Sequence, residues 1–112
     1  MGHFTNYRTE RYNGVGAIAE TFDPDVNIVL SQVRLHLDIA GGVAEDFTIT
    51  MDSATDPSHD ANLLTQDMEE VLDLNYIPDN PVVLQRGDEL DFAYANTNGR
   101  TWGLEVMYRT ET

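Results

Sequence analysis

Acidic residues spaced along the segment from residue 52 to residue 61 form the group in this chain best suited to hold a metal ion. Asp52, Asp56 and Asp60 recur at a regular spacing among polar, turn-forming residues. Hard cations such as calcium are bound by carboxylate oxygens from loops of this kind. The EF-hand spacing and its central glycine are absent from the sequence. The segment is therefore a candidate calcium site, and an ordinary solvated loop is the alternative.

Catalytic chemistry has less support than metal binding. The three histidines, His3, His36 and His59, are not accompanied by a Gly-x-Ser-x-Gly elbow, and the chain has no cysteine. Carboxylate pairs such as Asp67 and Glu69 are easy to find among twenty acidic residues, but no pattern ties them to a pocket. His36 lies in a strand-like run, which favours a cross-strand contact over catalysis. No catalytic residue is expected, and the chain is predicted not to be an enzyme.

The composition describes one small, acidic domain. A length of 112 residues is enough for a single hydrophobic core. Twenty acidic residues stand against six arginines and no lysine, so the formal net charge is −14. This charge repels phosphate backbones and anionic membrane surfaces, so neither nucleic acid nor a membrane is expected as a direct partner. No segment approaches the ~18 consecutive apolar residues of a membrane span.

Two alternating segments predict strands that position the polar residues. Between Gln32 and Ile39, apolar and polar residues alternate strictly, which is the period of a half-buried strand. After Gly41 and Gly42, residues 47–51 alternate again and are rich in β-forming residues. We expect these two segments to be neighbouring antiparallel strands that share a core face.

The C-terminal region predicts a second pair of strands, a hairpin over residues 90–108. A three-residue loop that ends in a glycine sets Tyr94 opposite Trp102 and keeps apolar residues on one face. The same register sets Asp91 opposite Glu105 on the outer face. Directly opposed like charges are destabilising, so an arginine, a cation or a bulge is expected beside them.

The remaining segments complete an all-β pattern. Residues 62–74 fit a helix or strands, and we favour a short strand near Leu63, a turn, and a second strand that ends at Tyr76. Seven or eight short strands predict an antiparallel β-sandwich of jelly-roll type, with an immunoglobulin-like topology as the alternative. Residues 14–112 are expected to form this single domain, and residues 1–13 an extended N-terminal arm.

The predicted arm alternates aromatic and polar residues and holds two of the six arginines. Such a segment on an otherwise acidic body suits docking into a neighbouring subunit, and a frayed terminus is the alternative. A flat outer face of small residues, including Ala93 and Gly103, is a second expected contact surface, so the chain is also expected to form homo-oligomers. The partner-binding residues expected in the arm are Phe4, Tyr7, Arg8, Arg11 and Tyr12.

Residues 77–109 resemble a known class of proteins. They contain Pro78-Asp79-Asn80-Pro81 before a short apolar strand, Gly87-Asp88-Glu89-Leu90 at the start of the next, and Asn98-Gly99 before Trp102-Gly103-Leu104-Glu105-Val106. In these features the region resembles small β-sandwich structural proteins of tailed bacteriophages. The resemblance implies a head-decoration, head-spike or tail-associated subunit of the virion that has no enzymatic activity and contacts other virion proteins.

A binding module is the alternative to a structural virion protein. A carbohydrate- or receptor-binding β-sandwich would use the 52–61 loop, assisted by calcium, together with exposed aromatic rings that stack on a sugar. At strand spacing, such rings more often belong to a core. The rings in question are Phe92, Tyr94, Trp102 and Tyr108.

Overall fold

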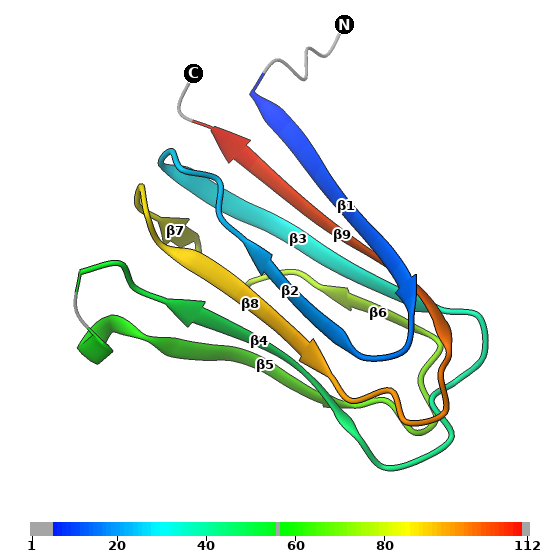
Figure 1. The fold of residues 1–112 in the computed structure, drawn as a ribbon. Helices are drawn as coiled ribbons and strands as arrows, with labels where there is room; N and C mark the ends of the chain where they lie inside the picture. The colour runs from blue at the N-terminus through cyan, green and yellow to red at the C-terminus, as the bar shows by residue number, and fades with distance from the viewer. Residues whose placement is uncertain (1–5, 56, 111–112) are drawn as a thin grey trace, which may run out of the picture.

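The chain folds into two antiparallel β-sheets that enclose one apolar core (Figure 1). The computed structural model describes residues 6–55 and 57–110. No helix in this described part is long and apolar enough to cross a membrane. The described elements are β1 (Tyr7–Val15), β2 (Ile18–Phe22), β3 (Ile28–Leu37), β4 (Asp46–Asp52), the short 3-10 helix η1 (Pro57–His59), β5 (Ala61–Asp67), β6 (Asp73–Tyr76), β7 (Val82–Leu84), β8 (Glu89–Tyr94) and β9 (Thr101–Thr110).

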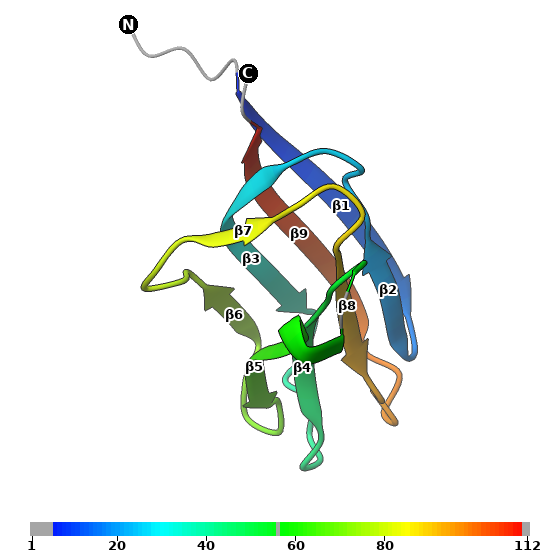
Figure 2. The same ribbon diagram turned by 90° about the vertical axis from the view of Figure 1, so that its left-hand side faces the viewer.

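The larger sheet has five strands in the order β1-β9-β3-β6, with β7 also paired to β3. Figure 2 shows β6 and β7 one after the other beside β3. The two prolines Pro78 and Pro81 lie between them. Proline has no backbone N–H to donate to a neighbouring strand, which accounts for the interruption. The smaller sheet has four strands in the order β2-β8-β4-β5.

The core is formed by the alternate residues of both sheets that face inward. Along β3 and β9 every inward residue between Val33 and Leu37, and between Trp102 and Val106, is buried. The four-stranded sheet contributes stacked rings, since Phe47 and Phe92 lie 6.3 Å apart at an interplanar angle of 10°. The sequence-based expectation of an all-β, sandwich-like fold is confirmed, as are a strand near Leu63 and a strand that ends at Tyr76. The strand expected from Gln32 to Ile39 is β3, which runs from Ile28 to Leu37 and leaves Ile39 outside the strand and 57% exposed.

Both predicted pairings of consecutive strands are wrong. The two strands of the expected hairpin, β8 and β9, lie in opposite sheets, so Tyr94 pairs with Ile18 and Phe47 rather than with Trp102. The same holds for β3 and β4, which were expected to be neighbours. The alternation of apolar and polar residues in these four strands was predicted correctly, but this alternation determines only which residues face the core. Two strands that face each other across a core show the same alternation as two strands of a hairpin.

A buried asparagine holds the connection that carries the chain from β8 across to β9. Asn96 is 3% exposed and has the left-handed backbone angle φ of 49°. Its Nδ2 donates to the carbonyl oxygens of Gly16 and Arg100 at 2.7 and 2.9 Å, and its Oδ1 accepts from the Arg100 N–H at 2.9 Å. The Gly16 carbonyl also accepts from Trp102 Nε1 at 3.0 Å. These bonds close an arch between the sheets instead of a hairpin turn.

The predicted N-terminal arm is part of the sheet from Tyr7 onward. Strand β1 pairs with β9 along its whole length, from Tyr7 opposite Arg109 to Val15 opposite Thr101. The expected boundary after Asn13 falls inside this strand, and the chain turns only at Gly16, which has a positive φ. Alternating aromatic and polar residues are as typical of an edge strand as of an arm. With β1 included, the described residues form nine strands rather than seven or eight.

Candidate functional site

The candidate calcium loop does not gather its predicted ligands. Asp56 lies outside the described residues. Asp60 is used within the loop, where its Oδ1 accepts the Ser53 N–H at 2.8 Å. Asp52 ends β4 and lies opposite Glu89, beside Asp91, with the carboxylate oxygens of these three residues within 4.8 Å of one another. Neither partner of Asp52 could be found from the spacing of the loop, because both come from the distant strand β8.

The Asp52–Glu89–Asp91 group is part of an acidic surface. Burial, followed by the negative charges of Asp91, Asp23 and Asp52, raises the pKa of the Glu89 carboxyl. No arginine occurs in the four strands of this sheet. Its outer face therefore carries negative charge that no arginine of these four strands offsets. The acidic residues that point outward from it are Asp46, Asp52, Asp67, Glu89 and Asp91.

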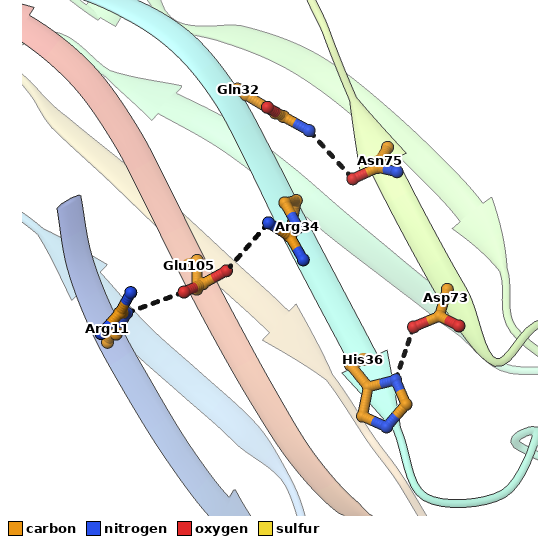
Figure 3. Close-up of polar contacts among 7 residues, drawn as sticks. All are labelled: Arg11, Gln32, Arg34, His36, Asp73, Asn75 and Glu105. Carbon is orange, nitrogen blue, oxygen red and sulfur yellow. Dashed lines mark hydrogen bonds and ion pairs between the residues drawn. The ribbon is translucent and has the colours of Figure 1, made fainter. Parts of the chain in front are cut away.

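The outer face of the five-stranded sheet has the opposite character. Arg11, Arg34 and Arg109, three of the six arginines in the chain, lie on it, on strands β1, β3 and β9. Glu105 on β9 lies between two of them: its Oε2 is 2.7 Å from Arg11 Nε, and its Oε1 is 3.5 Å from Arg34 Nη1 (Figure 3). The arginine, cation or bulge expected beside Glu105 depended on its pairing with Asp91, and that pairing is wrong. The expected clash with Asp91 does not arise, because Asp91 lies on the other sheet.

Two further cross-strand contacts extend this polar surface toward β6. His36 Nδ1 lies 2.5 Å from Asp73 Oδ1, and Gln32 Nε2 donates to Asn75 Oδ1 at 3.0 Å (Figure 3). The expected cross-strand role of His36 is thus what the structure shows. These contacts fix the positions of side chains that are otherwise largely exposed, since the His36 and Asp73 side chains are 63% and 64% accessible.

A shallow hollow of about 580 Å³ lies in the middle of this surface. Its floor is the strand residue Gly103, which is paired with Asn13 on one side and His36 on the other. A Cβ atom at Gly103 would meet no atom within 4 Å, so the missing side chain leaves open space between its neighbours. Arg11, Arg34 and Glu105 line the hollow along one side. We refer to this hollow and its charged rim as the Gly103 groove.

The Gly103 groove can offer hydrogen bonds and paired charges. No serine, threonine or cysteine lines it. The Arg11 and Arg34 side chains are 74% and 55% accessible, so both guanidinium groups keep donors that face solvent. Exposed arginines of this kind are common in protein contact surfaces. The arrangement suits the carboxylates and carbonyl groups of another protein.

The aromatic rings proposed for sugar stacking are not on the surface. Phe92, Tyr94 and Trp102 are 1%, 2% and 4% exposed and belong to the core. Tyr108 is half-buried and packs against Phe22, with the ring centroids 5.0 Å apart. The alternative reading of these rings as core residues was therefore correct. The small residues Ala93 and Gly103 do not share one outer face, since they lie on different sheets.

The residues predicted for the arm fall into two groups. Phe4 lies outside the described residues. Tyr7 and Arg11 point to the outer face of the five-stranded sheet, and the Arg8 Nη1 donates to the Tyr7 carbonyl at 3.0 Å. Tyr12 points the other way and packs against the core. Burial, followed by the charges of Glu10 and Glu20, raises the pKa of the Tyr12 hydroxyl to about 12.

Comparison with known proteins adds no family to these observations. No protein-family model matches the chain, and no curated protein is similar enough to count as a relative. Sequence reasoning missed Arg34 as a candidate site residue, and it placed Glu105 and Gly103 beside the wrong neighbours, because these residues lie on strands that come together only in the sheet. The one available signal was that Arg34 and Glu105 occupy polar positions of alternating strands.

Proposed function

We propose that this chain is a non-enzymatic structural protein of a virus particle that decorates or stabilises the head or associates with the head or tail. It acts in the virion through contacts with other virion proteins and with its own copies. The observation that carries the proposal is the placing of two arginines, Arg11 and Arg34, on the rim of the Gly103 groove, with Arg109 on the same outer face, in an otherwise strongly acidic chain. A flat, exposed and rigid surface of that kind suits docking onto the acidic surface of another protein.

We also infer that the sandwich is a jelly roll. The orders β1-β9-β3-β6 and β2-β8-β4-β5 support it, as does a chain that changes sheet at every connection except β4 to β5 and β6 to β7. If β6 and β7 count as one interrupted strand along β3, each sheet has four strands, as in an eight-stranded jelly roll. Jelly rolls are found in viral capsid proteins and in lectins, so this topology supports the proposal without separating the two classes.

Two further observations favour a structural protein over a carbohydrate-binding module, and a third limits the kind of partner. The rings that would stack on a sugar are buried. The candidate calcium ligands do not lie together, since Asp52 lies beside Glu89 and Asp91 while Asp60 accepts a hydrogen bond from Ser53. The net charge of −14 disfavours direct contact with a packaged genome, which leaves protein surfaces as the partners.

Binding to particles tests the proposal. Virus particles from the source culture are purified on a density gradient, and the chain is followed with an antibody raised against the recombinant protein. We expect the chain to sediment with the particles and immunogold label to lie on them. A chain that stays entirely in the soluble fraction, or one that binds a glycan on an array and no particle, would contradict a structural role.

Variants then test the surface. Recombinant chain carrying both Arg11→Glu and Arg34→Glu is added to particles stripped of the native protein. It should rebind at least about tenfold more weakly than the wild type, because each change places like charge against an acidic partner. Arg86→Glu, which changes the net charge by half as much, is the control, since Arg86 is an exposed arginine in a turn away from the groove, 3.4 Å from Asp25. Equal loss of binding in both variants would assign the effect to net charge alone.

A further inference from the structure

Strand β1 leaves one long margin of the five-stranded sheet open. It is nine residues long, and β9 is the only strand paired with it in the described part of the chain. Figure 1 shows β1 at the margin, with no strand on its far side. The other margin strands, β2, β5 and β6, have five, seven and four residues. Native sheets usually shield such a margin with proline or a bulge, and the β1–β9 register contains neither.

The backbone hydrogen-bonding groups of alternate β1 residues point toward the open side. The Thr110 N–H donates to the Asn6 carbonyl at 2.9 Å, which makes Asn6 and Thr110 a hydrogen-bonded pair of the β1–β9 ladder. In an antiparallel ladder the next residue along points its N–H and C=O away from that neighbour. Thr9, Arg11 and Asn13 therefore direct these groups outward. The contact of Arg8 with the Tyr7 carbonyl from the solvent side agrees with this assignment.

We propose that the open edge of β1 pairs with β1 of a second copy, antiparallel across a twofold axis centred on Thr9. The order Tyr7-Arg8-Thr9-Glu10-Arg11 is complementary to itself when reversed. In this register Arg8 lies opposite Glu10 of the second copy, and by symmetry Glu10 lies opposite Arg8. Opposite charges placed directly across a strand pair are stabilising.

The outer face of the same register is also complementary. Tyr7 lies opposite Arg11 of the second copy, and Arg11 lies opposite Tyr7 of the second copy. Each guanidinium can therefore approach an aromatic ring. The ladder would join the two five-stranded sheets into one continuous sheet, with the two Gly103 grooves on the same side. Arg8 would exchange its contact with the Tyr7 carbonyl for the carboxylate of the second copy.

Registers centred on a charged residue place like charges together. A twofold axis through Glu10 sets that carboxylate against its own copy, and an axis through Arg11 does the same for the guanidinium. A shift that pairs odd with even residues is excluded, because it would set outward-pointing backbone groups against inward-pointing ones. Only the register centred on Thr9 has two opposite-charge pairs and no like-charge pair among the described residues.

A second copy is the partner that this edge suits best. The chain as a whole carries a formal net charge of −14, so two copies repel each other over most of their surfaces. The segment Tyr7–Val15 has two arginines and one glutamate, and it borders the arginine-bearing outer face, so repulsion is smallest there. This inference deepens the contact role proposed above, on which it rests for its place in a particle. Dimer formation by the purified chain is nevertheless measured without particles.

Charge exchange tests the pairing. Sedimentation equilibrium of the full chain up to about 100 μM should show a monomer–dimer equilibrium. Arg8→Glu sets two glutamates against each other on both sides of the axis, and Glu10→Arg does the same with arginines. Each single variant should weaken the dimer by about 10- to 100-fold, since two attractive pairs become repulsive. The double variant R8E/E10R restores both pairs and should dimerise within about threefold of the wild type.

The controls distinguish a specific β1 pairing from loss of the fold and from a change of net charge. Both substitutions lie at exposed strand positions, and circular dichroism of each of the three variants verifies that the fold is retained. Arg86→Glu alters net charge as much as Arg8→Glu does, and it should leave the dimer unchanged. A wild-type chain that stays monomeric, or a double variant no better than the singles, overturns the β1 pairing. Neither result decides the outcome of the particle-binding experiment, so the β1 dimer and the virion role can be refuted independently.

Discussion

Replacing Asn96 by alanine removes the clamp that directs β9 into the sheet opposite β8. The side chain makes three hydrogen bonds, two through Nδ2 to the carbonyls of Gly16 and Arg100 and one through Oδ1 to the Arg100 N–H. Asn96 is also almost fully buried and has a positive φ. Asn96→Ala therefore removes the partners of buried backbone groups and places alanine in a conformation that it adopts poorly.

The expected loss of stability can be estimated from the three hydrogen bonds and the left-handed backbone conformation. Each hydrogen bond contributes about 1 kcal/mol to stability, which gives about 3 kcal/mol for the three. The left-handed conformation adds roughly 1 kcal/mol for a residue with a Cβ that cannot bond locally. The expected loss in the free energy of unfolding is thus about 4 kcal/mol, a large share of the 5–15 kcal/mol typical of a single domain. The melting temperature should fall by roughly 15 °C for a chain of this size.

Urea unfolding followed by circular dichroism, with a parallel thermal melt, measures this loss. Asn98→Ala is the matched control in the same connection. Asn98 is exposed and makes one hydrogen bond, from Nδ2 to the Gly41 carbonyl at 2.9 Å, so it should lose only about 1 kcal/mol. If Asn96→Ala lost no more stability than Asn98→Ala, the asparagine clamp would not be what holds the arch.

Three further substitutions test the core and the acidic face. Tyr94→Phe should leave the urea midpoint unchanged or raise it, because the buried Tyr94 hydroxyl has no hydrogen-bond partner among the described residues. Gly41→Ala should lower the midpoint sharply, since its Cβ would lie 2.5 Å from the Tyr94 hydroxyl and 2.6 Å from the Met68 carbonyl oxygen; a neutral result would refute that packing. Glu89→Gln should raise the melting temperature at pH 7. Its carboxyl has a raised pKa in the folded state, so the charge destabilises the fold at neutral pH, and this effect disappears as the pH falls through the folded pKa. The advantage of Glu89→Gln over the wild type should therefore shrink in acid, and a constant advantage would contradict the charge argument.

Residue alternation was enough to predict which residues of most strands face the core. Val33, Leu35 and Leu37 are buried as the pattern in β3 requires, and Leu90, Phe92 and Tyr94 are buried as the pattern in β8 requires. The reason is local, because successive side chains of a strand point to opposite faces whatever the strand is paired with. The interruption between β6 and β7 was likewise readable, because proline lacks an N–H wherever it occurs.

The candidate site could be predicted only in part. Tyr7 and Arg11 were expected to contact a partner, and the structure places both on the outer face of β1. Their neighbours were not predictable, since the partner of Arg11 in the ion pair, Glu105, is 94 positions away along the chain. Gly103 was expected on a contact surface together with Ala93, but not as the floor of a groove, because a glycine in a strand forms a groove only when longer side chains flank it on the adjacent strands.

The sequence alone determined the fold class, the direction in which each strand faces, and the strongly acidic charge of the chain. The tertiary structure decided which strands are neighbours, and thereby placed arginines on one sheet and uncompensated carboxylates on the other. The physical reason lies in the connections: a short loop can close a hairpin within one sheet or cross to the other. Here the crossing from β8 to β9 is held by the bonds of Asn96 with Gly16, a residue 80 positions away that only the folded chain brings near.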